Sequence, residues 1–113
     1  MLARANRIVD GRDYRLTVRR GSRVVHPNTV TYVAATNDHE IVRFGFIVAK
    51  NVGIAVVRNR LRRRLKAACF DLHKRAEPGT DVVIRALPNA RVARWTTLRD
   101  EISQALVGRS GTK

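Results

Sequence analysis

The densest group of chemically specialised side chains lies between Arg58 and Lys66, where six of nine residues are basic. Guanidinium groups bind phosphate through paired hydrogen bonds, and their flat faces stack on nucleobases. Like charges four residues apart cost a helix a few tenths of a kcal/mol each, and no acidic residue follows until Asp71. A helix face that served only solubility would include glutamates. The spacing therefore predicts a binding surface for a polyanion, although an ordinary solvated helix face remains the plainer alternative.

Helical periodicity divides this segment into a buried side and a charged side. An apolar stripe recurs at helical spacing: Leu61, Leu65, Ala68, Cys69 and Leu72. At about 100° per residue, one broad outward face holds Asn59, Arg62, Arg63 and Lys66. Arg60 and Arg64 flank the stripe on its other side, and Arg58 lies nearer its edge in the first turn. The free N–H groups of the helix start would also attract phosphate.

The net charge of the whole chain points to the same class of partner. The 113 residues carry 23 Lys and Arg against 9 Asp and Glu, a formal charge of +14. Residues 1–25 have a net charge of +5 and residues 58–75 of +7, around a neutral middle at 26–57. Such self-repulsion is tolerable when a polyanion is the normal partner. Nucleic acid is the favoured partner. The alternatives are that the charge binds an acidic membrane surface, or that it is simply solvated and binds nothing.

The sequence offers no constellation for catalysis by the protein itself. The nine acidic residues are scattered, and His26, His39 and His73 lack the spacing of metal ligands. A protein nuclease needs clustered carboxylates for metal ions or a positioned general base. Cys69, the only cysteine, lies on the apolar stripe and is expected to be a small core residue. We expect no catalytic residue and no metal site in the protein.

Residue patterns predict the elements that position the basic segment. A first helix is expected at 10–20, with Asp10 as its cap and Gly21 as the residue that ends it. The other expected elements are strands at 23–26, 29–35, 41–48 and 80–87, and helices at 55–72 and 96–107. A turn at 36–39 would make an antiparallel hairpin of the strands at 29–35 and 41–48.

The order α-β-β-β-α-β-α predicts an α+β sandwich, a sheet with helices packed on it. We expect one domain over residues 1–113, with flexible ends at 1–9 and 108–113. No apolar run approaches the length needed to cross a bilayer, and the start of the chain lacks the apolar centre of a secretory signal. With a single cysteine, these features predict a cytoplasmic protein.

A longer pattern around the basic helix resembles a known family. Gly53-x-Ala55-Val56-x-Arg58-Asn59-Arg60-Leu61-x-Arg63 resembles the signature of the bacterial ribonuclease P protein family. The resemblance covers nearly the whole chain. It includes Asn6-Arg7, Asp13-Tyr14, Gly21, Tyr32, Arg43-Phe44-Gly45-Phe46 and Lys50.

The resemblance implies a fold and two RNA-binding surfaces. The fold would be that of domain 2 of ribosomal protein S5, with an unusual left-handed βαβ crossover. The surface facing the catalytic RNA, near the cleavage site, would comprise Arg58, Asn59, Arg60, Arg62, Arg63 and Lys66. A cleft for the single-stranded leader would comprise Tyr14, Val18, Val30, Tyr32 and Ile47. Further basic contacts would come from Arg7, Arg12 and Lys50.

The resemblance also implies what the protein does and with which partners. The catalytic RNA would remove the 5′ leader of precursor tRNA using Mg²⁺ held by RNA, and the protein alone would be inactive. We expect no membrane or small-molecule partner and a monomer apart from the RNA. Val18 stands where the family usually has an aromatic residue, and Ile47 where it has a small polar one. Tyr14 and Tyr32 have ordinary packing as their alternative role.

Two other functions remain open from the residues alone. A ribosomal or ribosome-assembly protein would share the charge and the fold type, although the Arg-Asn-Arg pattern at 58–60 speaks against it. A metal-dependent nuclease working without RNA would need carboxylates that the sequence does not cluster.

Overall fold

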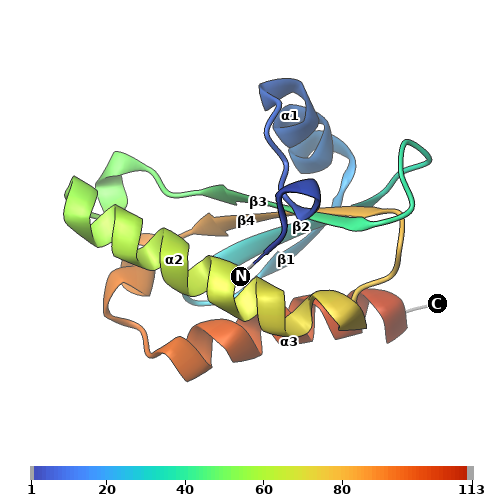
Figure 1. The fold of residues 1–113 in the computed structure, drawn as a ribbon. Helices are drawn as coiled ribbons and strands as arrows, with labels where there is room; N and C mark the ends of the chain where they lie inside the picture. The colour runs from blue at the N-terminus through green and yellow to red at the C-terminus, as the bar shows by residue number, and fades with distance from the viewer. Residues whose placement is uncertain (1, 112–113) are drawn as a thin grey trace.

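The chain folds into a four-stranded sheet and three helices (Figure 1). The structure is a computed structural model that describes the backbone of residues 2–111 and the side chains of residues 2–107. The helices are α1 (Gly11–Arg20), α2 (Ala55–Leu72) and α3 (Trp95–Gly111). The strands are β1 (Ser22–Val25), β2 (Thr29–Ala35), β3 (Val42–Ile47) and β4 (Thr80–Ala86). Short 3₁₀ turns are η1 (Arg4–Asn6), η2 (Lys50–Val52), η3 (His73–Arg75) and η4 (Pro88–Val92). The predicted order α-β-β-β-α-β-α is confirmed.

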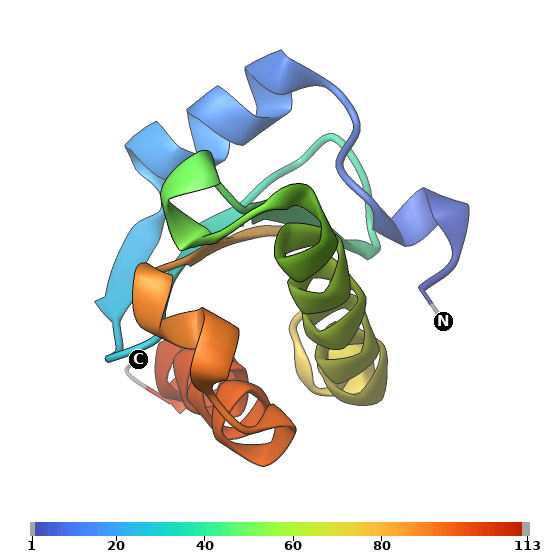
Figure 2. The same ribbon diagram turned by 90° about the vertical axis from the view of Figure 1, so that its left-hand side faces the viewer.

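The helices cover the two faces of the sheet unequally, with α1 on one face and α2 and α3 on the other (Figures 1 and 2). The larger apolar core lies under α2 and α3, where Phe44, Leu65 and Ile102 have no exposed surface. A smaller core under α1 contains Val30 and Val83. Each fully buried side chain of this size contributes roughly 1.5–3 kcal/mol, so α2 and α3 are the firmly held layer.

The sheet order is β1-β2-β4-β3, which overturns the predicted hairpin of β2 and β3. β4 lies between these two strands, antiparallel to β2 and parallel to β3. Its residues Val82, Val83 and Ile84 are all 0% exposed, and the central position of a sheet is where a wholly apolar strand buries both faces. The turn after β2 is held by the residue before β4 instead, since the Thr36 N–H donates to the Gly79 carbonyl at 2.9 Å.

The path from β3 through α2 to β4 joins two parallel neighbours and is left-handed. In Figure 1 both strands run from right to left, α2 returns below the sheet, and Figure 2 places β3 on the α2 side of β4. Such crossovers are right-handed in nearly all proteins. The left-handed path agrees with the fold that the resemblance implied, and no local pattern would have indicated it.

Gly21 ends α1 as predicted, but for a different reason. Its N–H donates to the Thr17 carbonyl at 2.8 Å, while its φ of −73° is open to any residue. A Cβ at this position would lie 2.6 Å from the Thr17 oxygen and 3.0 Å from the Val33 oxygen. Glycine is therefore needed because two backbone segments pass close to it. At the other end of α1, the Asp10 carboxylate accepts from the Arg12 N–H at 2.9 Å, as predicted.

The start of the chain is packed rather than free, which differs from the flexible end expected at 1–9. Leu2 is 3% exposed and Ile8 is 4% exposed. The Ile8 N–H donates to the Phe44 carbonyl at 2.8 Å, and the Asn6 amide donates to the Val42 carbonyl at 2.8 Å. These bonds extend the edge of β3. At the other end α3 continues to Gly111, and the last two residues of the expected tail at 108–113 lie outside the described residues.

Candidate nucleic-acid interface

The basic face of α2 rests on a fully buried apolar stripe. All five residues of the predicted stripe are buried, from Leu61 at 3% to Leu72 at 0% exposed, so this prediction is confirmed. The cations opposite the stripe differ in exposure. Asn59, Arg60 and Arg63 are exposed, whereas Arg58, Arg62, Arg64 and Lys66 are half-buried. The buried stripe fixes how the helix is rotated, and thereby fixes where the cations point.

Two of these arginines are tied to the backbone around the start of α2. The Arg58 Nε donates to the Gly53 carbonyl at 3.0 Å. Arg62 donates from Nη1 to the Asn59 Oδ1 at 3.0 Å and from Nη2 to the Val48 carbonyl at 3.4 Å. Asn59 therefore positions the Arg62 guanidinium, which is a physical role for the asparagine between Arg58 and Arg60. Oriented guanidinium groups lose less conformational entropy when they bind phosphate.

None of the described acidic side chains neutralises the cations between positions 58 and 66 of α2. Among the side chains of residues 2–107, Asp13 and Asp81 pair with Arg43, Asp81 with His39, and Asp71 with Arg99. No carboxylate in that part of the chain lies within 4 Å of a cation between positions 58 and 66. The N-cap residue of α2, Ile54, makes no side-chain hydrogen bond, and the first turn carries no acidic residue. This end of α2 is therefore strongly positive.

A groove of about 500 Å³ lies beside this face. Four elements line it: the N-terminal segment, α1, β3 and α2. Its cations are Arg4, Arg7, Arg62 and Lys66. Its aromatic rings are Tyr14 and Phe46, and the buried Phe44 lies behind them, while Ile8 and Val9 complete the wall. Cations beside aromatic rings are the combination by which proteins hold single-stranded nucleic acid.

The Tyr14 side chain is held in this groove by two contacts with β3. Its hydroxyl accepts a hydrogen bond from the Phe46 N–H at 3.1 Å. Its ring lies directly against Gly45: a Cβ added to this glycine would be only 2.5 Å from the ring, which is too close for any other residue. Gly45 thus allows α1 to approach β3 closely.

The five residues of the expected leader cleft come together in one small cluster between α1 and the sheet, but unequally. Val30 is 4% and Tyr32 is 6% exposed, so both are covered. Tyr14, Val18 and Ile47 are half-buried at the margin of the cluster. The accessible part of this surface is therefore its rim, formed by these three residues.

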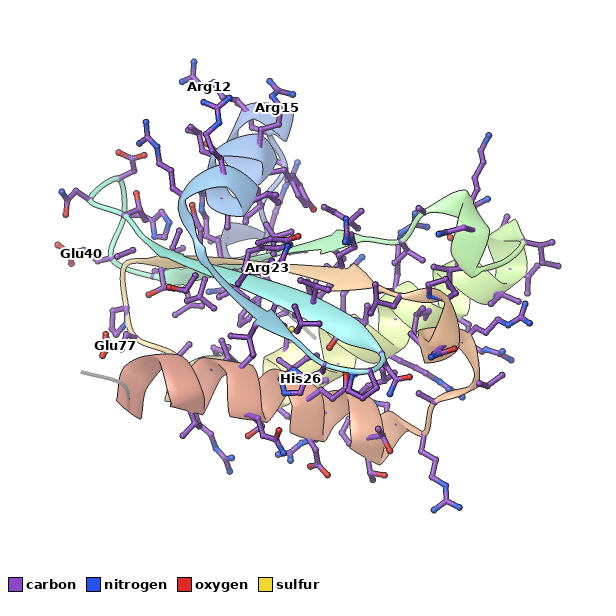
Figure 3. All side chains as sticks on the ribbon, turned by 180° about the vertical axis from the view of Figure 1, so that it is seen from behind. Arg12, Arg15, Arg23, His26, Glu40 and Glu77 are labelled. Carbon is purple, nitrogen blue, oxygen red and sulfur yellow. The ribbon has the colours of Figure 1, made fainter. Side chains whose placement is uncertain are left out.

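Of the three further basic residues expected at the site, one lines the groove. Arg7 is in its wall, next to Arg62 and Lys66. Arg12 points with Arg15 from α1 away from the sheet (Figure 3), and Lys50 is exposed in η2. Arg4 and Phe46 were missed as site residues. The alternation of Phe44 and Phe46 on one face of β3 was the available signal for Phe46, whereas nothing local to Arg4 places it in the groove.

The carboxylates of Asp13 and Asp81 both bind one arginine, Arg43. Arg43 donates from Nε and Nη2 to the Asp81 carboxylate at 2.9 and 2.8 Å, and from Nη2 to Asp13 at 3.4 Å. Burial alone would raise the pKa of Asp81, but hydrogen bonds from Arg43 and His39 outweigh it and lower that pKa. The hydrogen bond with Asp81 raises the pKa of Arg43. Burial raises the pKa of the Cys69 thiol, as befits a core residue.

This network does not fit a Mg²⁺ ion held by the protein, because its carboxylate oxygens already bind a guanidinium group. Over the described residues, no three side chains of His, Cys, Asp or Glu gather where they could hold a metal. None of the helices over those residues is long and apolar enough to span a membrane.

The fold and the groove define a class: a small, strongly basic α+β protein that presents a cationic, aromatic-lined surface to nucleic acid. A family model described as Ribonuclease P matches residues 2–109. The chain belongs to the ribonuclease P protein family. It is therefore a protein component of ribonuclease P and a partner of its RNA, which decides against the ribosomal alternative.

Curated relatives support this assignment, and solved structures share the fold. The ribonuclease P protein component of Clavibacter michiganensis is 47% identical over 106 residues, covering 94% of each chain. That of Rhodococcus opacus is 40% identical over 113 residues, covering 95% of this chain and 90% of the relative. The RNase P protein of Staphylococcus aureus superposes with a TM-score of 0.80 at 22% identity, covering 96% and 97%. That of Thermotoga maritima superposes with a TM-score of 0.78 at 20% identity, covering 88% and 94%.

Proposed function

We propose that this chain binds the catalytic RNA of ribonuclease P through the basic face of α2 and assists removal of the 5′ leader from precursor tRNA. The observation that carries the proposal is the set of unneutralised cations on α2, from Arg58 to Lys66, beside a groove with aromatic walls. Each phosphate that these cations neutralise releases condensed counterions, so binding should be strong and steeply dependent on salt.

The division of labour in this proposal follows from the side chains. The described side chains offer cations and aromatic rings but no free group of carboxylates, so RNA would hold the Mg²⁺ and carry out the chemistry. The protein would raise substrate affinity and reduce repulsion between two polyanions. RNA and precursor tRNA would be its only partners, and a cytoplasmic monomer apart from the RNA stays our prediction.

We assign the leader to the accessible rim of the small cluster between α1 and the sheet, formed by Tyr14, Val18 and Ile47. Tyr14 supplies a ring whose orientation is fixed by its bond to the Phe46 N–H. Val18 and Ile47 supply apolar contact without a ring, so base stacking rests on Tyr14 and on Phe46 in the adjoining groove. We therefore expect modest affinity for the leader and weak preference among its bases.

Cleavage of a precursor tRNA by three samples in moderate Mg²⁺ tests the proposal. The samples are this protein alone, the cognate ribonuclease P RNA alone, and both together. We expect efficient release of the leader in the mixture, slow release with RNA alone, and none with protein alone. A folded protein that leaves cleavage by the cognate RNA unchanged would refute the proposal.

A further inference from the structure

A second hollow, of about 460 Å³, opens on the other side of the basic face of α2. Its lining comes mainly from α2 and the start of α3, two elements that Figure 1 shows below the sheet. Arg7, Arg63 and Lys66 provide its cations, and Phe70, Trp95 and Leu2 provide most of its apolar lining. Arg7 and Lys66 also line the first groove, so the two hollows share a cationic border.

The spacing along α2 brings cations and an aromatic ring onto one face. Arg63, Lys66 and Phe70 follow one another at intervals of three and four residues, as side chains that share a helix face do. Phe70 is 42% exposed, whereas its neighbours Ala68 and Cys69 are fully buried. The ring is therefore presented at the surface and adds little to the core.

Trp95 is held in place at the other wall of this pocket. The Arg99 guanidinium lies 6.0 Å from the centre of its ring, a cation–π distance. Arg99 also pairs with Asp71 at 3.5 Å, which neutralises the acidic residue of the pocket. The remaining charge is positive, and the Nε of Arg7 is buried without a hydrogen-bond partner.

We infer that this pocket binds an unpaired nucleotide, whose base contacts Phe70 and Trp95 and whose phosphates contact Arg63, Lys66 and Arg7. The inference rests on the proposed function, because the nucleotide would belong to the RNA partner or to its substrate. Aromatic rings accept any base by stacking, while cations beside them bind the backbone. A strand that crosses the shared border would occupy both hollows, with Arg7 and Lys66 on the phosphates between two bases.

The chain contains its own reporter for this pocket, since Trp95 is its only tryptophan. The full-length protein is titrated with a single-stranded RNA hexamer of adenosine at low salt, and Trp95 fluorescence is followed. We expect quenching, and affinity at least about fivefold higher than for an abasic ribose-phosphate hexamer of equal charge. Hexamer binding detected by anisotropy without any change at Trp95 would overturn the inference. Equal quenching by hexaglutamate would also overturn it.

Two substitutions separate stacking from general attraction. Phe70→Leu keeps an apolar side chain but removes the ring, and should weaken hexamer binding at least about fivefold. Arg63→Ala should weaken it more than Arg75→Ala, which removes the same charge from the exposed η3 turn. Equal effects of the two arginine substitutions would leave only non-specific attraction and refute the pocket.

Failure of the inference can be told apart from failure of the proposed function. A wild-type chain that supports leader cleavage but gives no Trp95 response would remove the pocket and keep the proposed function. A chain whose Trp95 responds to the hexamer without supporting cleavage would keep the pocket and remove the proposed function.

Discussion

Arg62 shows how one residue of the basic helix is prepared for its partner. Its two hydrogen bonds, to the Asn59 side chain and the Val48 carbonyl, point the guanidinium into the groove wall. In the sequence it is one of six cations in nine residues, with no sign of its special position. Periodicity identified the face on which Arg62 lies. Its hydrogen bond to the Val48 carbonyl, just after β3, is visible only in the fold.

Arg62→Ala should weaken binding to the ribonuclease P RNA and lower the slope of log affinity against log salt by about 1, because one phosphate contact is lost. Asn59→Ala should weaken binding less, since the arginine remains but is no longer oriented. In the Arg62→Ala background, Asn59→Ala should have almost no further effect. Additive losses in this double-mutant cycle would show that Asn59 acts independently of Arg62.

Tyr32 illustrates a residue whose two predicted roles can be separated by experiment. At 6% exposure it is packed between α1 and the sheet, so Tyr32→Ala should lower the free energy of unfolding by about 3–5 kcal/mol. Urea unfolding measures this loss, and Val18→Ala at the half-buried margin should cost less. A loss under about 1 kcal/mol would contradict the packing.

Tyr32→Leu retains most of the apolar volume and asks whether the ring also serves the leader. Because the ring is 6% exposed beneath the rim that we assign to the leader, we expect the preference of the holoenzyme for precursor over mature tRNA to change little. A loss of affinity for precursor tRNA alone would show that the Tyr32 ring also serves the leader.

At the scale of elements, the network of Arg43, which lies on β3, joins four parts of the fold. It links Asp13 on α1 with Asp81 on β4, and Asp81 also accepts from His39 in the loop before β3. These bonds hold α1 against the sheet at one end of the leader surface. Because Asp81 is 10% exposed in its side chain, the network is shielded from solvent more than a surface ion pair would be.

The stability of this network should depend on pH in a defined direction. The folded pKa of Asp81 is below its ordinary value of 3.8. Its stabilising contribution is therefore complete above that ordinary value and is lost as pH falls through the folded pKa. Asp81→Asn should cost about 1.5–3 kcal/mol at pH 7 and clearly less at pH 2.5, measured by urea unfolding. Asp100→Asn, at an exposed position, is the matched control. A cost independent of pH would contradict the ionic role of Asp81.

The elements themselves were predictable to different degrees, for physical reasons. β2 begins at Thr29 and ends at Ala35 as expected, and α2 begins at Ala55, because period-two and period-3.6 patterns are local. The pairing of β2 and β3 was predicted wrongly, since the strand that lies between them, β4, follows both in the sequence and comes only after α2. The packing of Leu2 and Ile8 could not be foreseen either, because an apolar residue near a terminus carries no information about its partner.

At the scale of the molecule, the interface is assembled from parts that lie far apart in the sequence. One groove brings together Arg4, Arg7, Tyr14, Phe46 and the cations of α2. They meet because the N-terminal segment lies along the edge of β3, and β3 leads into α2. The basic helix and the leader residues could be proposed from the sequence and its family resemblance. The groove between them, and the pocket at Trp95, required the fold.

The most direct test of this account is the affinity of two equally charged double variants for the ribonuclease P RNA at physiological salt. Arg63→Glu with Lys66→Glu reverses two charges on the basic face of α2. Lys74→Glu with Arg75→Glu reverses two exposed charges in η3, just beyond the C-terminal end of α2. We predict that the first pair weakens binding at least about tenfold more than the second, with both proteins folded. Equal losses would show that net charge alone attracts the RNA, and would contradict the assignment of the interface to α2.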